Sequence, residues 1–265
     1  MIKSLHIKCR PEEQGLLPHS TGHLLYSAVL NSIEKTNPEL SSKIHSTDDK
    51  KVSVTPIKGE FRKKDSKRKE VFSDTEYRFF INLINSEGFS ELFSDFVLSD
   101  QEIDIAGESF TVTGMDTEEI SWDDIMEKKT PRELMFNFMS PVCIKYKGSG
   151  VTEMFPHREA VFMSLLYSWN RQAPKKFHFD VDLEDLKKKV FEKSFEHSTA
   201  NTVVTRKNKN RIKEFGFTGR TAYGFKDAPD KLKKKLAILA RYAEYSGVGS
   251  HTARGLGNTQ TEVRY

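Results

Sequence analysis

The two halves of this sequence repeat one order of strand-like and helix-like segments, and this repetition limits the fold more than any other feature. Alternating apolar residues predict strands, whereas apolar residues three or four apart predict helices. In the first half we expect strands at 2–9, 51–58, 76–84, 102–105 and 109–115, helices at 21–35 and 88–97, and a hairpin tip at 61–69. In the second half we expect strands at 133–146, 203–206, 215–225 and 258–265, and helices at 156–171 and 230–246.

Each half therefore has an approximate strand-helix-strand-strand-helix-strand order, which is that of a ferredoxin-like domain. A chain of 265 residues is long enough for two domains of this size, each with its own core. The acidic, polar stretch at 116–132 is typical of a linker. We predict an α+β protein of two tandem ferredoxin-like domains, at 1–120 and 131–265.

A glycine-rich segment, Gly247-Val-Gly-Ser-His-Thr-Ala-Arg-Gly-Leu-Gly257, lies between the last predicted helix and the last predicted strand. Glycine permits positive φ and lets backbone N–H groups approach a phosphate. The candidate phosphate-binding residues are Gly247, Gly249, Ser250, His251, Thr252, Arg254, Gly255 and Gly257. A nucleotide-hydrolase phosphate loop precedes a helix and ends in Gly-Lys-Ser/Thr, and this segment has neither property. A plain flexible turn is the alternative interpretation.

A second candidate surface is a basic run between two strand-like segments. Its residues are Arg206, Lys207, Lys209, Arg211 and Lys213, with Arg220 further along the chain. A hairpin arm of this kind can place cations along the phosphates of an A-form RNA helix. A solvated turn explains the same charges.

Histidine exchanges protons near neutral pH, so His45 is the main candidate for acid/base chemistry. It lies at a loop edge with Lys51 close behind. These groups suit cleavage of RNA by attack of a 2′-hydroxyl on its own phosphate, a reaction that needs no metal. His23 and Tyr26 are three residues apart on the first predicted helix and share one face. A solvated histidine at position 45, and ordinary helix packing at 23 and 26, are the alternatives.

Composition adds few constraints. The net charge is only +4, so a nucleic-acid surface must come from local clustering of cations. Cys9 and Cys143 lie in apolar stretches without metal-ligand spacing, so we expect reduced core thiols. No apolar run is long enough to cross a bilayer. We therefore expect a cytoplasmic protein with no membrane partner, no metal site and no cofactor.

Several segments together resemble one family. Besides the glycine-rich segment within 243–258, they are Thr21-Gly-His-Leu-Leu-Tyr, Asn37-Pro-Glu-Leu with Ile44-His45, and Phe217-Thr-Gly-Arg. The sequence is similar, nearly from end to end, to the CRISPR-associated endoribonucleases of the Cas6 family, within the RAMP superfamily of RNA-binding proteins. The resemblance implies cleavage of precursor CRISPR RNA within its repeats, without metal, leaving a 5′-hydroxyl and a 2′,3′-cyclic phosphate.

By this resemblance the catalytic histidine is His45 and its supporting lysine is Lys51. The tyrosine that some members carry on the first helix corresponds to Leu30, so Tyr26 or His23 would take its part. The glycine-rich segment and the basic run are implied to hold the RNA. Repeat RNA is the implied partner, with other Cas proteins and a second copy of the chain as further candidates. The alternative function is a non-catalytic RAMP-type subunit that only binds RNA, and a less favoured one is a nucleotide-binding enzyme.

Overall fold

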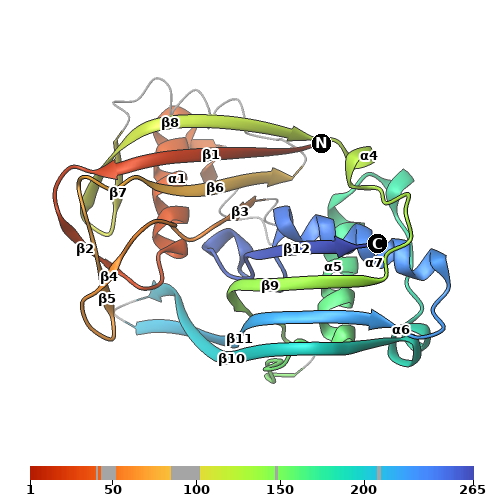
Figure 1. Ribbon diagram of the computed structural model, residues 1–265. Coiled ribbons are helices and arrows are strands. Elements are labelled where there is room, and N and C mark those ends of the chain that lie inside the picture. Colours follow the sequence, from red (N-terminus) through yellow and green to blue (C-terminus); the bar gives the residue numbers. More distant parts are fainter. Residues whose placement is uncertain (40, 43–51, 85–101, 147–148, 208–209) are drawn as a thin grey trace. The chain divides into compact units, whose positions relative to one another are not determined.

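The computed structural model describes residues 1–39, 41–42, 52–84, 102–146, 149–207 and 210–265 (Figure 1). These residues form two compact units. The N-terminal unit comprises Ile2–Glu119 together with Ala253–Gly255, and the C-terminal unit comprises Met1, Ile120–Thr252 and Leu256–Tyr265. The short segment Ala253–Gly255 thus belongs to the unit that is otherwise built from the first half of the chain.

The N-terminal unit contains a five-stranded sheet in the order β3-β6-β1-β8-β7. Its elements are β1 (Ile2–Pro11), α1 (Gly22–Thr36), β3 (Val52–Val54), β6 (Tyr77–Ile84), β7 (Glu102–Ile105) and β8 (Glu108–Ile120). A smaller sheet has the order β2-β5-β4 and consists of β2 (Gly15–Pro18), β4 (Arg62–Lys63) and β5 (Arg68–Val71). The predicted helix at 88–97 lies outside the described residues.

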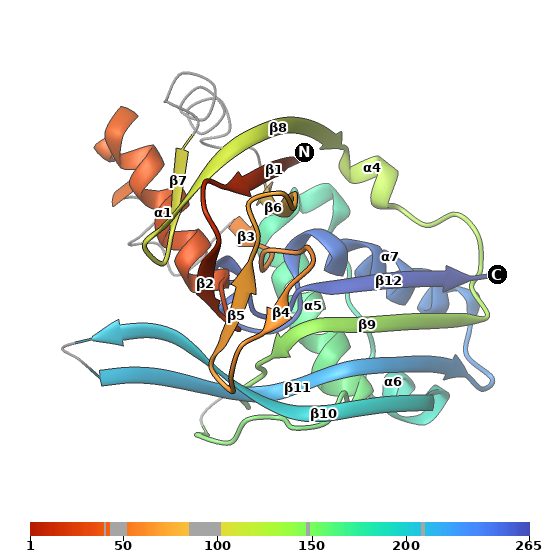
Figure 2. The same ribbon diagram turned by 60° about the vertical axis from the view of Figure 1, so that its left-hand side comes forward.

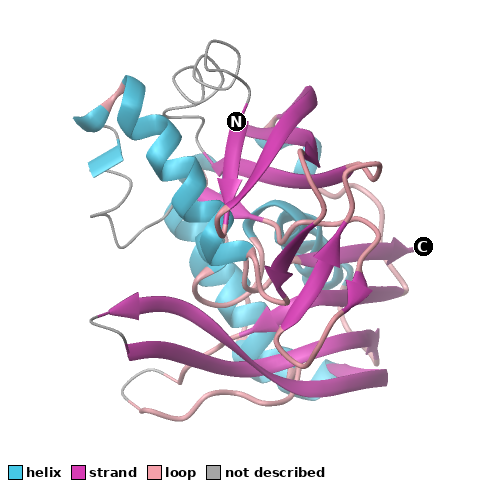
Figure 3. Cartoon of the chain, turned by 90° about the vertical axis from the view of Figure 1, so that its left-hand side faces the viewer, coloured by secondary structure: helices cyan, strands magenta, loops and turns pink. Residues whose placement is uncertain are grey.

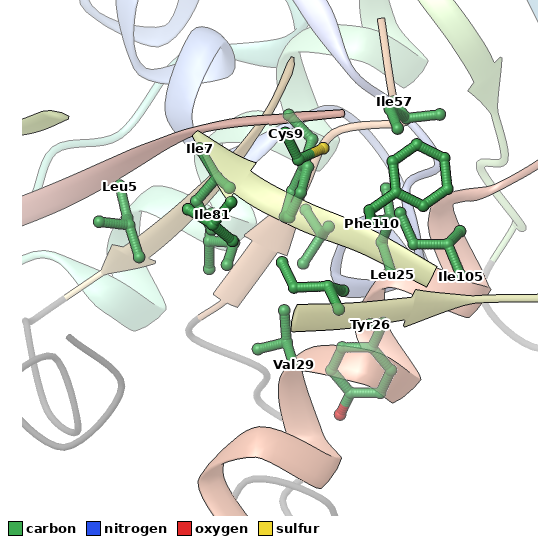
Figure 4. Close-up of a cluster of buried hydrophobic side chains, with 14 of the residues drawn as sticks. Leu5, Ile7, Cys9, Leu25, Tyr26, Val29, Ile57, Ile81, Ile105 and Phe110 are labelled. Atoms are coloured by element: carbon green, nitrogen blue, oxygen red, sulfur yellow. The ribbon is translucent and has the colours of Figure 1, made fainter. Parts of the chain in front are cut away.

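One face of the five-stranded sheet forms the core of this unit with α1 (Figure 4). Alternate residues of β1, such as Leu5 and Ile7, are fully buried there because side chains alternate between the faces of a strand. From α1, Leu25 and Val29 project into the same cluster, four residues apart on one helical face. Cys9 also lies in this core as a free thiol, as the sequence predicts.

The C-terminal unit contains a four-stranded sheet in the order β10-β11-β9-β12. Its elements are α4 (Trp122–Ile125), β9 (Glu133–Val142), α5 (Arg158–Gln172), α6 (Leu183–Lys189), β10 (Val190–Lys207), β11 (Asn210–Phe225), α7 (Asp230–Ser246) and β12 (Thr259–Arg264). The fully buried aromatic residues Phe136, Phe162 and Tyr223 pack edge to face between the sheet and α5. Trp169 is also fully buried, and its indole N–H donates to the carbonyl of Phe177 (2.9 Å).

The two units share one strand order. The first strand of each sheet, β1 or β9, is central. The third strand of that sheet in chain order, β6 or β11, pairs on one side of it, and the last long strand, β8 or β12, pairs on the other. The orders are therefore β3-β6-β1-β8 and β10-β11-β9-β12. This is the antiparallel arrangement of a ferredoxin-like domain. The prediction of two tandem ferredoxin-like domains is therefore confirmed.

The hairpin of β10 and β11 extends well beyond the sheet (Figure 2). These strands pair continuously up to Lys207 and Asn210, whereas β9 pairs with β11 only from Phe217 to Gly224. We call the outer part, residues 201–207 and 210–215, the β-ribbon (Figure 3). The predicted hairpin is therefore present, and its strands are longer than the sequence pattern indicates. Another difference is that β8 continues to Ile120, into the stretch expected to be a linker.

Candidate functional site

The glycine-rich segment folds into a compact loop between α7 and β12, as the sequence predicts. All four predicted glycines have positive φ, at Gly247 (68°), Gly249 (84°), Gly255 (80°) and Gly257 (65°). Two of them are also required by close packing. A Cβ on Gly249 would lie 2.5 Å from the carbonyl oxygen of Cys143, and one on Gly257 would lie 2.0 Å from that of Val248. Side chains are therefore excluded at these positions both by backbone conformation and by lack of space.

Several amides of this loop are already bonded within the protein. The bonds run from Val248 N to Gly257 O (2.9 Å), from Gly257 N to Pro141 O (2.9 Å), from Ser250 N to Cys143 O (2.8 Å) and from Leu256 N to His251 O (3.3 Å). An anion would have to compete with these carbonyl acceptors for the same N–H groups. These four amides therefore hold the loop in shape, and RNA binding by the loop stays a prediction.

Glu214 on β11 contacts several polar side chains beside the loop. Its carboxylate accepts from Lys145 (2.8 Å) and from the Cys143 thiol (3.4 Å), and lies 3.4 Å from Nε2 of His251. Burial raises the pKa of Glu214, but the hydrogen bonds from Lys145 and Cys143 outweigh it, so the pKa lies below its ordinary value. His251, predicted as an RNA contact, is thus also within ion-pair distance of an acid. Glu214 and Lys145 could not be found from the sequence, because no local pattern links residues so far apart in the chain.

The N-terminal unit brings the start of α1 against the segment Ala253–Gly255. Gly22, the first residue of α1, packs so closely that a Cβ there would lie 2.5 Å from the carbonyl oxygen of Arg254 and from Cα of Gly255. The Thr21 hydroxyl is fully buried and accepts from the backbone N–H of Ile57 (3.2 Å). Two predicted elements, the first helix and the arginine of the glycine-rich segment, therefore meet within one unit.

Tyr26 lies one turn into α1 and is only 4% exposed. In Figure 4 its ring joins the hydrophobic cluster while its hydroxyl points away from the other labelled side chains. Burial raises the pKa of Tyr26, and the nearby positive charge of Arg254 partly offsets this. His23 lies on the same helix and is half-buried. Leu30, on the same helix, is buried in the core.

The remaining predicted site residues are placed less completely. His45, Lys51 and Lys209 lie outside the described residues. The backbone of Arg206 and Lys207 is in β10 and that of Arg211 is in β11. Lys213 and Arg220 are exposed on β11. Of the predicted basic residues, those that the structure describes therefore lie along the β-ribbon and the strand that continues from it.

Among the described residues, one group has the composition of a metal site. Ligand atoms of His157, Glu159 and Glu192 lie within 4.8 Å of one another. However, Arg158 donates to Glu192 from its guanidinium (2.9 Å) and from its backbone N–H (2.7 Å), and lies 3.8 Å from Glu159. The guanidinium thus occupies the place that a cation would take. In the same described part of the chain, no helix combines the length and apolarity that crossing a bilayer requires.

Two family models match the chain, one in each half. The model of the CRISPR-associated endoribonuclease Cas6 matches residues 136–259, and a model of the N-terminal part of the CRISPR-associated protein Cas6 matches residues 16–116. No curated protein matches the chain in sequence.

Solved structures resemble the whole chain. A product complex of a Thermus thermophilus Cas6 has a TM-score of 0.76 at 17% identity, covering 99% of this chain and 100% of that one. A second Cas6 product complex has a TM-score of 0.70 at 21% identity, with 99% and 100% covered. A structure described for a Cas6-related gene from Pyrococcus furiosus has a TM-score of 0.64 at 15% identity, with 99% of each chain covered. At these identities the similarity establishes the fold.

Proposed function

Because the chain belongs to the CRISPR-associated endoribonuclease Cas6 family, we propose that it cuts precursor CRISPR RNA within its repeats. The observation that carries the proposal is that two models of this one family match separate halves of the chain. Further support comes from the two tandem ferredoxin-like units, each with the strand order described above. The cationic residues Lys213 and Arg220 lie exposed on β11, where they suit an RNA backbone.

The proposed reaction is an internal transesterification. The 2′-hydroxyl oxygen attacks the adjacent phosphorus while a base removes its proton. The bond from phosphorus to the 5′-oxygen breaks, and an acid supplies a proton to that leaving oxygen. The products are a 2′,3′-cyclic phosphate and a 5′-hydroxyl, so neither water nor an oxidant is consumed. A cation near the phosphate stabilises the charge that develops on its oxygens.

We assign His45 to proton transfer and Lys51 to charge stabilisation, both by their match to the family pattern. His23 and Tyr26 are the assisting candidates on α1. Since burial raises the pKa of Tyr26, this phenol stays protonated at neutral pH and acts as a hydrogen-bond donor. Arg254, in the same unit, supplies a positive charge near the Tyr26 hydroxyl.

The test is a cleavage assay on repeat RNA in the presence of a chelator. We expect one cut, with a cyclic phosphate end identified by mass spectrometry. A 2′-deoxy nucleotide at the cut site should abolish the reaction, because it removes the nucleophile. His45→Ala should slow it by about 10²- to 10⁴-fold, the usual contribution of general acid–base catalysis. His157→Ala, at an exposed histidine of the C-terminal unit, is the matched control and should cut at the wild-type rate.

Full cleavage of the 2′-deoxy RNA by the wild-type protein would refute this mechanism, and so would full cleavage of unmodified repeat RNA by His45→Ala. The alternative, a non-catalytic RNA-binding subunit, predicts tight binding of repeat RNA with no product even after long incubation. A thermal shift on adding a nucleotide would instead favour a nucleotide-binding enzyme.

A further inference from the structure

The five-stranded sheet of the N-terminal unit has a second face, opposite its hydrophobic core. On β1 and β6, alternate residues line the core, and the residues between them must project from the other face. The strand pairing places these residues in rows across β1 and β6, Ser4 beside Asn82, His6 beside Phe80, and Lys8 beside Arg78. We call this surface the open face. It carries polar, aromatic and cationic side chains.

Hydrogen bonds fix one end of the open face. The Ser4 hydroxyl donates to Asn82 (2.7 Å), and the Asn82 amide donates to the hydroxyl of Ser53 (3.0 Å). Nε2 of His6 lies 3.1 Å from the Ser4 hydroxyl. The imidazole in turn meets the Phe80 ring edge to face, with centroids 4.5 Å apart. These contacts hold the two rings in a defined orientation.

The Phe80 ring has polar neighbours and is only half-buried, although it lies in the middle of a sheet. Its backbone N–H donates to the hydroxyl of Thr55 (2.9 Å), and its carbonyl accepts from the backbone N–H of Thr55 (2.9 Å). The ammonium group of Lys58 lies 5.5 Å from the ring centroid. An aromatic ring in this setting adds little to the hydrophobic core, but it offers a flat surface for stacking.

The charges on the open face are unevenly balanced. Towards β8, acids lie close to the face, with Asp116 3.0 Å from the ammonium group of Lys8 and Glu118 3.8 Å from Nε2 of His6. Towards β3, Lys58 and Arg78 are neighbours joined by two backbone hydrogen bonds, of 2.8 and 2.9 Å. Burial and the charge of Arg78 both lower the pKa of Lys58. Within the described part of the chain, neither cation forms a salt bridge, so this side attracts an anion.

We propose that the open face binds an unpaired nucleotide of the RNA substrate, with the base stacked on Phe80 and the phosphate held by Lys58 and Arg78. This inference rests on the proposed function. An aromatic ring beside two cations without acidic partners matches a base joined to a phosphate. The base must be unpaired, because bases within an A-form duplex are already stacked and cannot reach a protein ring. An acidic polypeptide would satisfy the cations but leave the ring unused.

The test uses repeat RNA with single-stranded flanks and measures affinity by fluorescence anisotropy over a series of salt concentrations. Phe80→Leu keeps an apolar side chain and removes the aromatic ring, so it should weaken binding by roughly 5- to 150-fold, the range seen for loss of one stacked base. Arg78→Gln and Lys58→Gln should each reduce the slope of log affinity against log salt by about 0.7. Tyr167→Leu, at an exposed aromatic of α5, and Lys187→Gln, at an exposed lysine of α6, are matched controls and should behave as wild type.

A second measurement locates the contact directly. RNA carrying 5-iodouridine in its flanks should crosslink on irradiation to a peptide that contains Phe80, and Phe80→Leu should lose this crosslink. Melting temperatures of all variants establish that they are folded. If wild-type protein binds flanked repeat RNA but Phe80→Leu and the two cation variants bind equally well, the inference is wrong while the proposed function stands. If wild-type protein neither binds nor cuts repeat RNA, both are wrong. If these variants bind RNA as well as wild type but bind polyglutamate more weakly, the open face binds an acidic protein and the inference is overturned.

Discussion

Replacing Gly255 with alanine is expected to destabilise the protein by about 2–5 kcal/mol, because the added methyl group meets two separate obstacles. The first is conformational. Gly255 has a φ of 80°, and left-handed backbone costs about 1–2 kcal/mol for a residue with a Cβ. The second is steric. The Cβ would lie 2.5 Å from Cα of Gly22 at the start of α1, and pushing two packed segments apart costs a further ~1–3 kcal/mol.

Gly107 offers a matched control that separates these two obstacles. Its φ is 89°, close to that of Gly255, but a Cβ there would have nothing within 4 Å. Gly107→Ala should therefore lose only the conformational part, about 1–2 kcal/mol. Urea unfolding followed by circular dichroism gives both free energies, and their difference measures the packing of the loop segment against α1. Equal losses in the two variants would show that this close contact does not constrain the protein.

Three further predictions concern other parts of the molecule. Glu214→Gln should destabilise the protein by about 1–2 kcal/mol at pH 7, because it removes the negative charge that accepts a hydrogen bond from the partly exposed ammonium group of Lys145. Because the folded-state pKa of Glu214 lies below its ordinary 4.5, the stability it adds is present above pH 4.5 and is lost as the pH falls further. Thermal melts of variant and wild type should therefore converge in acid, and a constant difference would contradict this. Burial and the charge of Glu76 raise the pKa of Cys9 to about 12, and burial also raises the pKa of Cys143. Both thiols should therefore resist a thiol reagent at pH 8 until the protein unfolds. Rapid labelling of native protein would argue against these sealed positions. Lys213→Gln and Arg220→Gln should each reduce the slope of log affinity for repeat RNA against log salt concentration by about 0.7–0.9. Unchanged slopes would exclude both residues from the RNA interface.

The sequence predicted some elements closely because their boundaries have local physical causes. The helix expected at 230–246 is α7, Asp230–Ser246, since its apolar residues recur at helical spacing and Gly247 ends it with positive φ. The strand at 102–105 matches β7 for a similar reason, because Ile103 and Ile105 alternate with exposed acids. Elements that bury one face leave a periodic signature that can be recognised without a structure.

The β-ribbon left no such signature. Residues 201–207 and 210–215 pair with each other beyond the end of β9, and their sequence lacks the apolar–polar alternation that predicts strands. The strand runs expected at 203–206 and 215–225 were therefore shorter than β10 and β11. Contacts between residues far apart in the chain could not be predicted either. Glu214 acquires its role from Lys145 and His251, which only the folded chain brings to it.

The assignment of Ala253–Gly255 to the N-terminal unit has a consequence for how the protein is made. The hydrophobic cluster of that unit includes Ala253, which is 1% exposed. On the ribosome, a nascent chain that has emerged only to residue 119 lacks this piece, so its first unit remains unfinished until residue 255 has emerged. Completion of the N-terminal unit thus waits for a segment that is synthesised after most of the C-terminal unit. Simple truncation between the halves would accordingly yield a fragment with a defective interior.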